Sequence, residues 1–166
     1  MPVVTGWEGR YYEDFEIGDT YRCRLGRTVT EVDNTWFTLL TNNTNQIHFN
    51  TEYGKRTEFG QCLMNSILTL AIVAGMGVAD VSENGFALGW DEIKLPNPVF
   101  AGDTLYSQSE VVDKRESRSK PEWGIVKVRT RGVKQDGTVV IDYTRSVMVW
   151  KRAHAPSRDL FPRIKE

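Results

Sequence analysis

Residues 63–78 read L-M-N-S-I-L-T-L-A-I-V-A-G-M-G-V, and this stretch decides the fold. Apolar side chains occupy almost every position, so a helix formed here presents an apolar surface all round and is expected to be buried on every side. Asn65, Ser66, Thr69 and two glycines interrupt the apolar run. The stretch therefore predicts a core helix and argues against a membrane span.

The pattern changes from helix to strand after this stretch. Four segments combine β-branched and aromatic residues with turn signals at their ends, namely residues 86–95, 104–113, 125–133 and 139–150. The Asp-Gly pair at residues 136–137 predicts a hairpin between the last two segments. Within residues 125–133, valines alternate with Lys127, Arg129 and Arg131, which predicts one apolar and one cationic face.

The first third of the chain predicts one further strand region and one short helix. Residues 20–32 are rich in β-branched residues and indicate a strand or a hairpin. Asp33 can cap a short helix that carries Trp36, Phe37 and Leu40 at helical spacing. Residues 42–50 are polar and indicate a loop.

One long buried helix and about five antiparallel strands define an α+β fold, in which a sheet wraps around a central helix. This is the hot-dog arrangement. A single domain is expected over residues 1–166, with its core at about residues 11–151 and a C-terminal tail at 152–166. Because one sheet can cover only one side of the helix, a second subunit is a natural partner, and we expect a homodimer.

Composition excludes several classes of protein. The 166 residues suffice for one core, and the hydrophobic and charged contents of 40% and 26% are ordinary for a soluble domain. A net charge of -1 gives no reason to expect a nucleic-acid or membrane partner. Residues 1–9 lack the basic and apolar pattern of a signal peptide, so a cytoplasmic location is expected. Two cysteines without C-x-x-C spacing predict no metal site.

His48 is the first candidate for chemistry. The chain has two histidines, and His154 lies in the Pro-containing tail, whereas His48 ends a polar loop just before the core helix. Imidazole is the natural general acid or base near neutral pH, because its unperturbed pKa is about 6.5. The alternative is a loop histidine that is hydrogen-bonded for structural reasons.

Segments in three regions of the chain resemble the MaoC-like (R)-specific enoyl-CoA hydratases. Residues 37–50, F-T-L-L-T-N-N-T-N-Q-I-H-F-N, are similar to the catalytic segment D-x-N-P-x-H of that family. Residues 11–21 and 26–33 resemble its opening strands. Residues 95–105, L-P-N-P-V-F-A-G-D-T-L, resemble its P-V-x-x-G-D-T-L strand entry. The resemblance covers about residues 11–151 and implies the hot-dog fold and an acyl-CoA substrate.

The resemblance implies roles for several loop residues. His48 falls on the catalytic histidine, and Asn45 falls on an asparagine that shapes the site. Asn43 stands where the family has its catalytic aspartate, and Gln46 replaces the proline. A carboxylate can accept a proton from water and a neutral amide cannot, so Asn43 is expected to orient a water molecule or to bind the substrate.

The start of the core helix is the expected oxyanion site. In the family, a main-chain N–H of a His-Gly pair stabilises the thioester oxyanion, and here Asn65 and Ser66 replace that pair. The donor would be the Ser66 amide, helped by the Asn65 side chain, because helix N-termini offer unpaired donors. The alternative is that both are ordinary helix-start residues.

Two mechanisms fit these residues. In the first, His48 alone deprotonates water and returns the proton to the α-carbon. In the second, the substrate supplies the missing carboxylate, since residues 94–106 and 114–122 look similar to relatives that hydrate dicarboxylic acyl-CoAs such as mesaconyl- or itaconyl-CoA. Such substrates need a cationic contact. The candidates for a carboxylate or CoA contact are Arg118, Arg129, Arg131 and Arg145.

The resulting hypothesis is a hydro-lyase that adds or removes water across the 2,3 double bond of an enoyl-CoA, with no cofactor beyond the CoA of the substrate. A hot-dog acyl-CoA thioesterase is a second possibility, although residues 63–78 lack the carboxylate that many such enzymes carry on this helix. A non-catalytic acyl-CoA-binding subunit is a third, because Asn43 replaces the aspartate.

Overall fold

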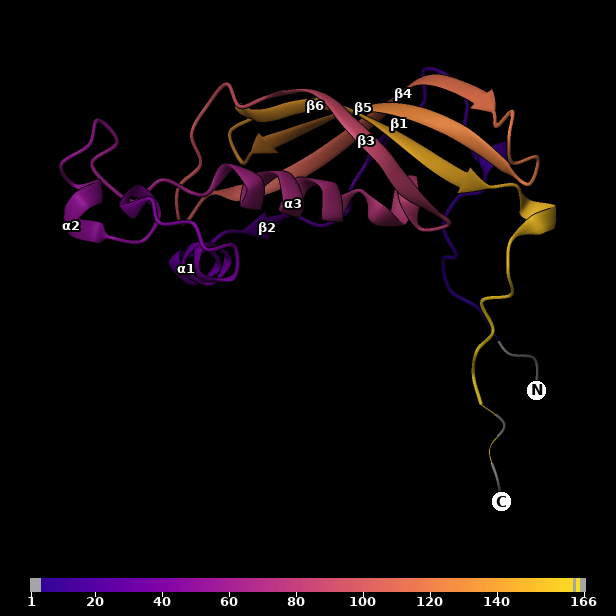
Figure 1. The fold of residues 1–166 in the computed structure, drawn as a ribbon, viewed down its shortest axis with the longest axis horizontal. Coiled ribbons are helices and arrows are strands. Elements are labelled where there is room, and N and C mark those ends of the chain that lie inside the picture. Colours follow the sequence, from indigo (N-terminus) through magenta and orange to yellow (C-terminus); the bar gives the residue numbers. More distant parts are fainter. Residues whose placement is uncertain (1–3, 163, 165–166) are drawn as a thin grey trace.

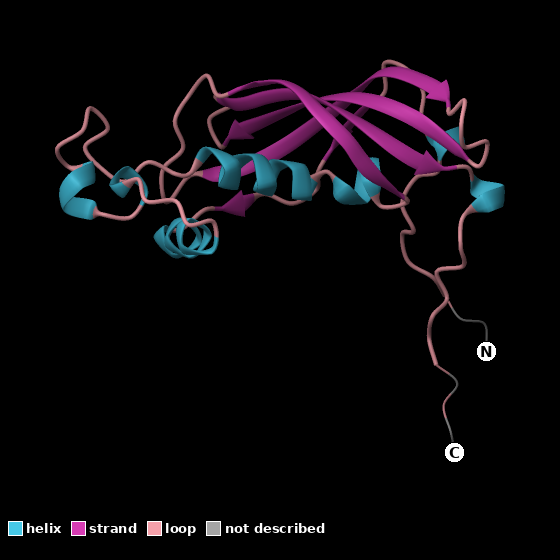
Figure 2. Cartoon of the chain, viewed as in Figure 1, coloured by secondary structure: helices cyan, strands magenta, loops and turns pink. Residues whose placement is uncertain are grey.

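An antiparallel sheet of six strands curves over one side of a central helix (Figures 1 and 2). This computed structural model describes residues 4–162 and 164. The strand order is β1-β4-β5-β6-β3, and β2 also pairs with β4. The strands are β1 (Thr20–Arg22), β2 (Arg27–Thr28), β3 (Gly85–Lys94), β4 (Thr104–Glu116), β5 (Trp123–Lys134) and β6 (Val139–Trp150). The predicted α+β fold is confirmed.

Three α-helices accompany the sheet: α1 (Glu31–Leu40), α2 (Thr51–Gly54) and the central α3 (Ser66–Met76). Short 3₁₀ turns lie at Tyr12–Asp14, Gln46–His48 and Arg152–His154, and a π-helical turn at Val78–Ser82 follows α3. No helix in the described part of the chain has the length and apolarity needed to cross a membrane.

The first helix begins earlier than the sequence predicted. Thr30 is its N-cap and accepts a hydrogen bond from the Asp33 N–H, while the Asp33 carboxylate accepts one from the Thr30 N–H. This reciprocal pair is a capping box. The prediction that Asp33 is the cap was wrong by three positions, because Asp33 supplies the second half of the box.

Residues 20–32, predicted as a strand or a hairpin, contain two short strands that do not form a hairpin with each other. Both β1 and β2 pair with β4 instead of with each other. In contrast, the hairpin between β5 and β6 forms as predicted, and Gly137 in its turn has a φ of 86°, a conformation that favours glycine.

The sheet has one buried and one outward face, as the alternation in β5 predicted. Val126 and Val128 are fully buried against Val111 and Val147. The basic side chains of β5 alternate with these valines, and Arg129 binds Asp142 of β6 on the outer face.

Helix α3 is covered on one side only within this chain. Leu68, Ile72 and Val73 are buried, whereas Ile67 is 59% exposed and Gly75 is also exposed. The prediction that the helix is buried on every side therefore does not hold for a single chain. The sheet cannot reach the far side of the helix.

Candidate active site

His48 lies at the end of the 3₁₀ turn that follows α1. This turn begins at Asn45, whose side-chain oxygen accepts a hydrogen bond from the Ile47 N–H. The His48 ring places Nδ1 2.8 Å from the main-chain oxygen of Leu63. A carbonyl oxygen can only accept, so Nδ1 carries the proton in this contact. In the neutral ring, Nε2 then keeps its lone pair, as a general base requires.

Helix α3 begins next to the Leu63 carbonyl that binds His48. Asn65 is the buried N-cap of α3, and its side-chain oxygen accepts a hydrogen bond from the Ile67 N–H at 2.9 Å. Within the described residues, neither the Ser66 N–H nor the Asn65 side-chain NH₂ has a hydrogen-bond partner. Asn65 is thus a structural cap, yet two donors at this positive helix end are free to bind an oxyanion.

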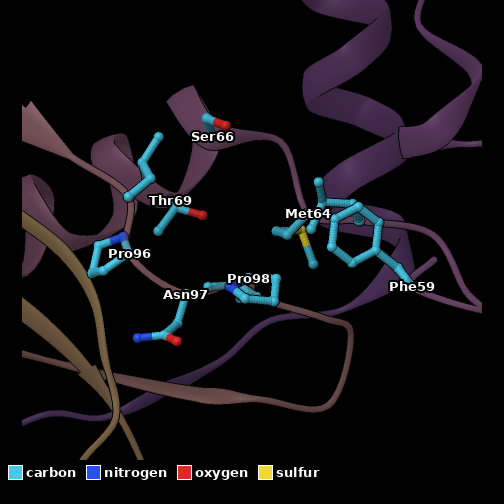
Figure 3. A pocket seen from close by; sticks show the side chains of 10 residues that line it. Phe59, Met64, Ser66, Thr69, Pro96, Asn97 and Pro98 are labelled. Atoms are coloured by element: carbon cyan, nitrogen blue, oxygen red, sulfur yellow. The ribbon is translucent and has the colours of Figure 1, made fainter. Parts of the chain in front are cut away.

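A cavity of about 220 Å³ opens beside the start of α3 (Figure 3). Ser66 and Thr69 contribute the hydroxyl groups of its wall, and Asn97 contributes an amide. The remaining lining is apolar and comes from Phe59, Leu63, Met64, Leu95, Pro96, Pro98 and Val99. Residues 95–99 were predicted only as a strand break and strand entry, so the sequence missed their role as a wall of this cavity.

Asn43 lies in the same loop as His48 but has different neighbours. Its side-chain oxygen accepts a hydrogen bond from the Asn45 N–H at 3.0 Å, and its own N–H donates to Thr38. Asn43 lines a separate cavity of about 400 Å³ between α1 and Phe49. No hydrogen bond joins Asn43 to His48 among residues 4–162.

Three of the four candidate arginines are not buried and do not line the cavity beside α3. Arg118 is exposed in the loop between β4 and β5. Arg129 lies on the outer face of the sheet and makes two hydrogen bonds to Asp142, at 3.0 and 2.6 Å. Arg131 lies on the same outer face, two residues along β5.

Arg145 differs from the other three because it is only 4% exposed and its Nε has no partner within the described chain. Burial lowers its pKa. However, the Asn97 amide binds Val139 at the start of β6, and Arg145 lies six residues further along that strand. At about 3.3 Å per residue, roughly 20 Å separates Arg145 from this end of the cavity. Arg145 therefore does not line this cavity within one chain.

The sequence pattern gave no sign of Asn34, which links the pieces of this site. Asn34 is 3% exposed. Its side chain hydrogen-bonds to the main-chain oxygens of His48 and Leu63 and to the main-chain N–H of Asn65. An asparagine inside an amphipathic helix carries no recognisable signal before the fold is known. Among the described residues there is no group of three or more side chains suited to holding a metal ion.

Solved structures with a similar fold show which class of protein this chain belongs to. A putative MaoC domain protein dehydratase from Chloroflexus aurantiacus has a TM-score of 0.85 and 31% identity, covering 98% of this chain and 47% of that one. A Mycobacterium tuberculosis protein described as having a double hotdog fold has a TM-score of 0.79 at 20% identity, covering 94% of this chain and 47% of that one. The chain is therefore a hot-dog domain of MaoC-like type.

The sequence comparison narrows this class. The profile of mesaconyl-CoA hydratase matches residues 3–159, and the chain belongs to this family. The mesaconyl-CoA hydratase of Cereibacter sphaeroides is 34% identical over 145 residues, which are 87% of this chain and 42% of that protein. The chain spans less than half the length of this relative.

Proposed function

We propose that this chain is a hydratase or dehydratase of 2-enoyl-CoA thioesters. One observation carries the proposal: the His48 ring is held through Nδ1 by the Leu63 carbonyl, directly before the helix whose Ser66 N–H has no partner among residues 4–162. A basic nitrogen and an oxyanion donor thus lie on adjoining segments. The names of the relatives agree with this chemistry, since a hydratase catalyses the addition of water to a double bond.

The reaction needs one base and one oxyanion donor. Nε2 of His48 takes a proton from water, and the oxygen of that water forms a bond to C3 of the enoyl group. The electron pair of the double bond moves toward the thioester oxygen, where the Ser66 N–H stabilises the negative charge. The protonated ring then returns its proton to C2. The net result is addition of one water molecule, and the reverse sequence is dehydration.

Asn43 replaces the carboxylate that the resemblance implies, so His48 is the proton carrier in this scheme. The Asn43 side chain can hold water through its NH₂ group, because only its oxygen is used within the loop. In the second mechanism, a carboxylate of the substrate takes the place of the missing aspartate.

We further propose a short branched or dicarboxylic acyl group as substrate. The cavity beside α3 is small and carries the hydroxyl groups of Ser66 and Thr69 and the amide of Asn97. The Ser66 hydroxyl and the second N–H of the Asn97 amide could donate hydrogen bonds to a second carboxylate, whereas the Thr69 hydroxyl donates to the Asn65 main-chain oxygen. None of the four candidate arginines lines this cavity in the described chain, so in this proposal hydrogen bonds take the place of the cationic contact expected from the sequence.

A panel of crotonyl-, mesaconyl- and itaconyl-CoA tests the proposed function. Loss of the conjugated thioester absorbance reports hydration, and free thiol reports hydrolysis. We expect absorbance loss without thiol and faster turnover of a dicarboxylic substrate than of crotonyl-CoA. Thiol release would identify a thioesterase, and CoA binding without either signal would identify a binding subunit. Equal turnover of crotonyl- and mesaconyl-CoA would contradict the dicarboxylate preference.

We also propose that the active form is a homodimer in which a second copy lies along β3. Within the described chain, β3 pairs only with β6, so its other edge is unpaired. Unpaired edges bind further strands readily. Exposed apolar residues cluster along and just after this strand, namely Phe86, Leu88, Trp90, Ile93 and Leu95. A cytoplasmic location stays a prediction.

A further inference from the structure

Asn34 lies on the buried side of α1 and reaches toward the His48 loop. It is 3% exposed, and its main-chain oxygen accepts a hydrogen bond from the buried Thr38 hydroxyl at 2.7 Å. The capping box of Thr30 and Asp33 fixes the turn of helix from which Asn34 projects.

The Asn34 side chain makes three hydrogen bonds. Its NH₂ group donates to the His48 oxygen at 2.6 Å and to the Leu63 oxygen at 3.0 Å. Its oxygen accepts from the Asn65 N–H at 2.9 Å. The opposite orientation of the amide would place an oxygen against two carbonyls and an NH₂ against an N–H. The three contacts therefore determine the orientation of the amide.

The Leu63 oxygen is shared between Asn34 and the ring of His48. It accepts from the Asn34 NH₂ at 3.0 Å and contacts His48 Nδ1 at 2.8 Å. Asn34 consequently holds both the main chain of His48 and the acceptor of its ring. The same side chain holds the Asn65 N–H, one residue before the Ser66 donor.

We infer that Asn34 is a positioning residue that keeps His48 protonated on Nδ1 and in register with the start of α3. The role of this register in catalysis rests on the proposed function, whereas the state of the ring can be tested without it. Loss of the Asn34 NH₂ would leave the His48 carbonyl without this donor, and the Leu63 carbonyl would be held by the His48 ring alone. The ring could then rotate or protonate on Nε2, and that form has no basic nitrogen facing the substrate.

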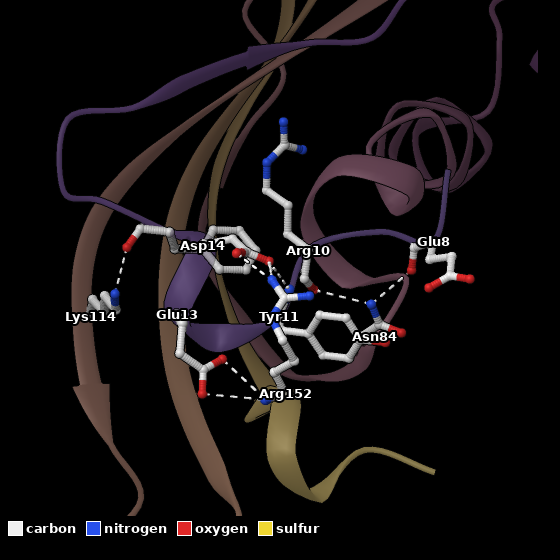
Figure 4. A network of polar contacts seen from close by, with 9 residues as sticks. Glu8, Arg10, Tyr11, Glu13, Asp14, Asn84, Lys114 and Arg152 are labelled. Atoms are coloured by element: carbon white, nitrogen blue, oxygen red, sulfur yellow. Dashed lines mark hydrogen bonds and ion pairs between the residues drawn. The ribbon is translucent and has the colours of Figure 1, made fainter. Parts of the chain in front are cut away.

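Asn84 provides a matched control, because its side chain makes the same kinds of bond elsewhere. Asn84 is 7% exposed, and its NH₂ donates to the main-chain oxygens of Glu8 and Arg10 at 2.8 and 3.3 Å (Figure 4). Its oxygen accepts from Arg158 at 3.2 Å. Replacing Asn84 therefore removes a comparable buried network without touching His48.

The experiment compares Asn34→Ala and Asn34→Asp with Asn84→Ala and Asn84→Asp. The Asp variants keep the accepting oxygen and lose the NH₂ donor. Histidine-labelled protein gives ¹⁵N ring signals from only His48 and His154, and these signals report which ring nitrogen is protonated. Steady-state kinetics with the best enoyl-CoA substrate, below the melting temperature of each variant, give kcat and KM separately.

We expect His48 of the wild type to be protonated on Nδ1 and both Asn34 variants to lose this preference. Their kcat should fall about 10- to 100-fold while KM changes less than about threefold, because misplacing a catalytic group costs rate. Asn84 variants should melt earlier but keep the wild-type ring signals. Wild-type ring signals in Asn34→Ala, or the same ring change in Asn84→Ala, would overturn the inference. Full activity of His48→Ala would instead overturn the proposed function.

Discussion

His48 is the residue on which the proposed chemistry depends. Replacing it by alanine should lower kcat about 10²- to 10⁴-fold, the range that general acid–base catalysis contributes. His154 is the control, since it is exposed in the short turn after β6. Its replacement by alanine should leave kcat unchanged. Comparable rates for His48→Ala and the wild type would remove His48 from the active site.

Asn43→Asp restores the carboxylate that the resemblance implies. The loop should keep its shape, because an Asp oxygen can accept the Asn45 N–H as the present amide oxygen does. We expect turnover of crotonyl-CoA to stay the same or to rise, since a carboxylate can accept a proton from water and a neutral amide cannot. A fall of tenfold or more, about 1.4 kcal/mol, would show that the neutral amide is required. Thermal melting of the variant provides the control for folding.

The sequence could identify residues whose side chains suit the proposed chemistry, but not the residues that position those side chains by hydrogen bonds. His48, Asn65 and Ser66 were predicted from motif position, and the structure places them on adjoining segments. Asn43 shares the loop but lines a separate cavity. The role of Asn34 depends on carbonyls of residues 48 and 63, and main-chain groups leave no trace in a residue pattern.

At the scale of elements, Asp103 joins the turn before β4 to the end of β5. It accepts hydrogen bonds from the Phe100 N–H at 3.0 Å and from Gln135 and Lys134, each at 3.2 Å. Burial opposes ionisation of Asp103, but these three donors outweigh burial and lower its pKa. A carboxyl group whose pKa is lowered by folding stabilises the native state when ionised.

Asp103→Asn should therefore lower the free energy of unfolding at pH 7 by roughly 1–3 kcal/mol. The difference from the wild type should shrink as the pH falls below about 4, because the wild-type carboxyl then becomes protonated through its lowered pKa. Urea unfolding at pH 7, 5 and 3 measures this. A difference that is constant across these pH values would contradict an electrostatic role for Asp103.

Long strands with a clear residue alternation could be predicted from the sequence. Short strands that pair only with a segment distant in the sequence could not. The alternation in β5 and β6 and the turn at Gly137 indicated a hairpin, and the observed β6 has the predicted bounds. Strands β1 and β2 have only three and two residues, and each exists because β4 offers an edge more than 75 residues away. No local pattern in residues 20–32 can show that partner.

At the scale of the whole molecule, one chain leaves apolar surface uncovered on α3 and on β3. Helix α3 exposes Ile67, and the edge strand β3 exposes Leu88 and Trp90 at 48% and 43%. The second copy of this chain that we propose along β3 would cover this apolar surface.

Sedimentation or light scattering at micromolar concentration should accordingly show a homodimer. Leu88→Lys places a charge on the unpaired edge strand, and charged edge residues oppose strand pairing. We expect this variant to be monomeric or to dissociate at least about tenfold more readily, about 1.4 kcal/mol of association free energy. Ile17→Lys is the matched control, because Ile17 is 64% exposed but lies just before β1, beside β4 at the opposite edge of the sheet. It should remain dimeric. A monomeric wild type, or equal dissociation of the two variants, would contradict assembly along β3.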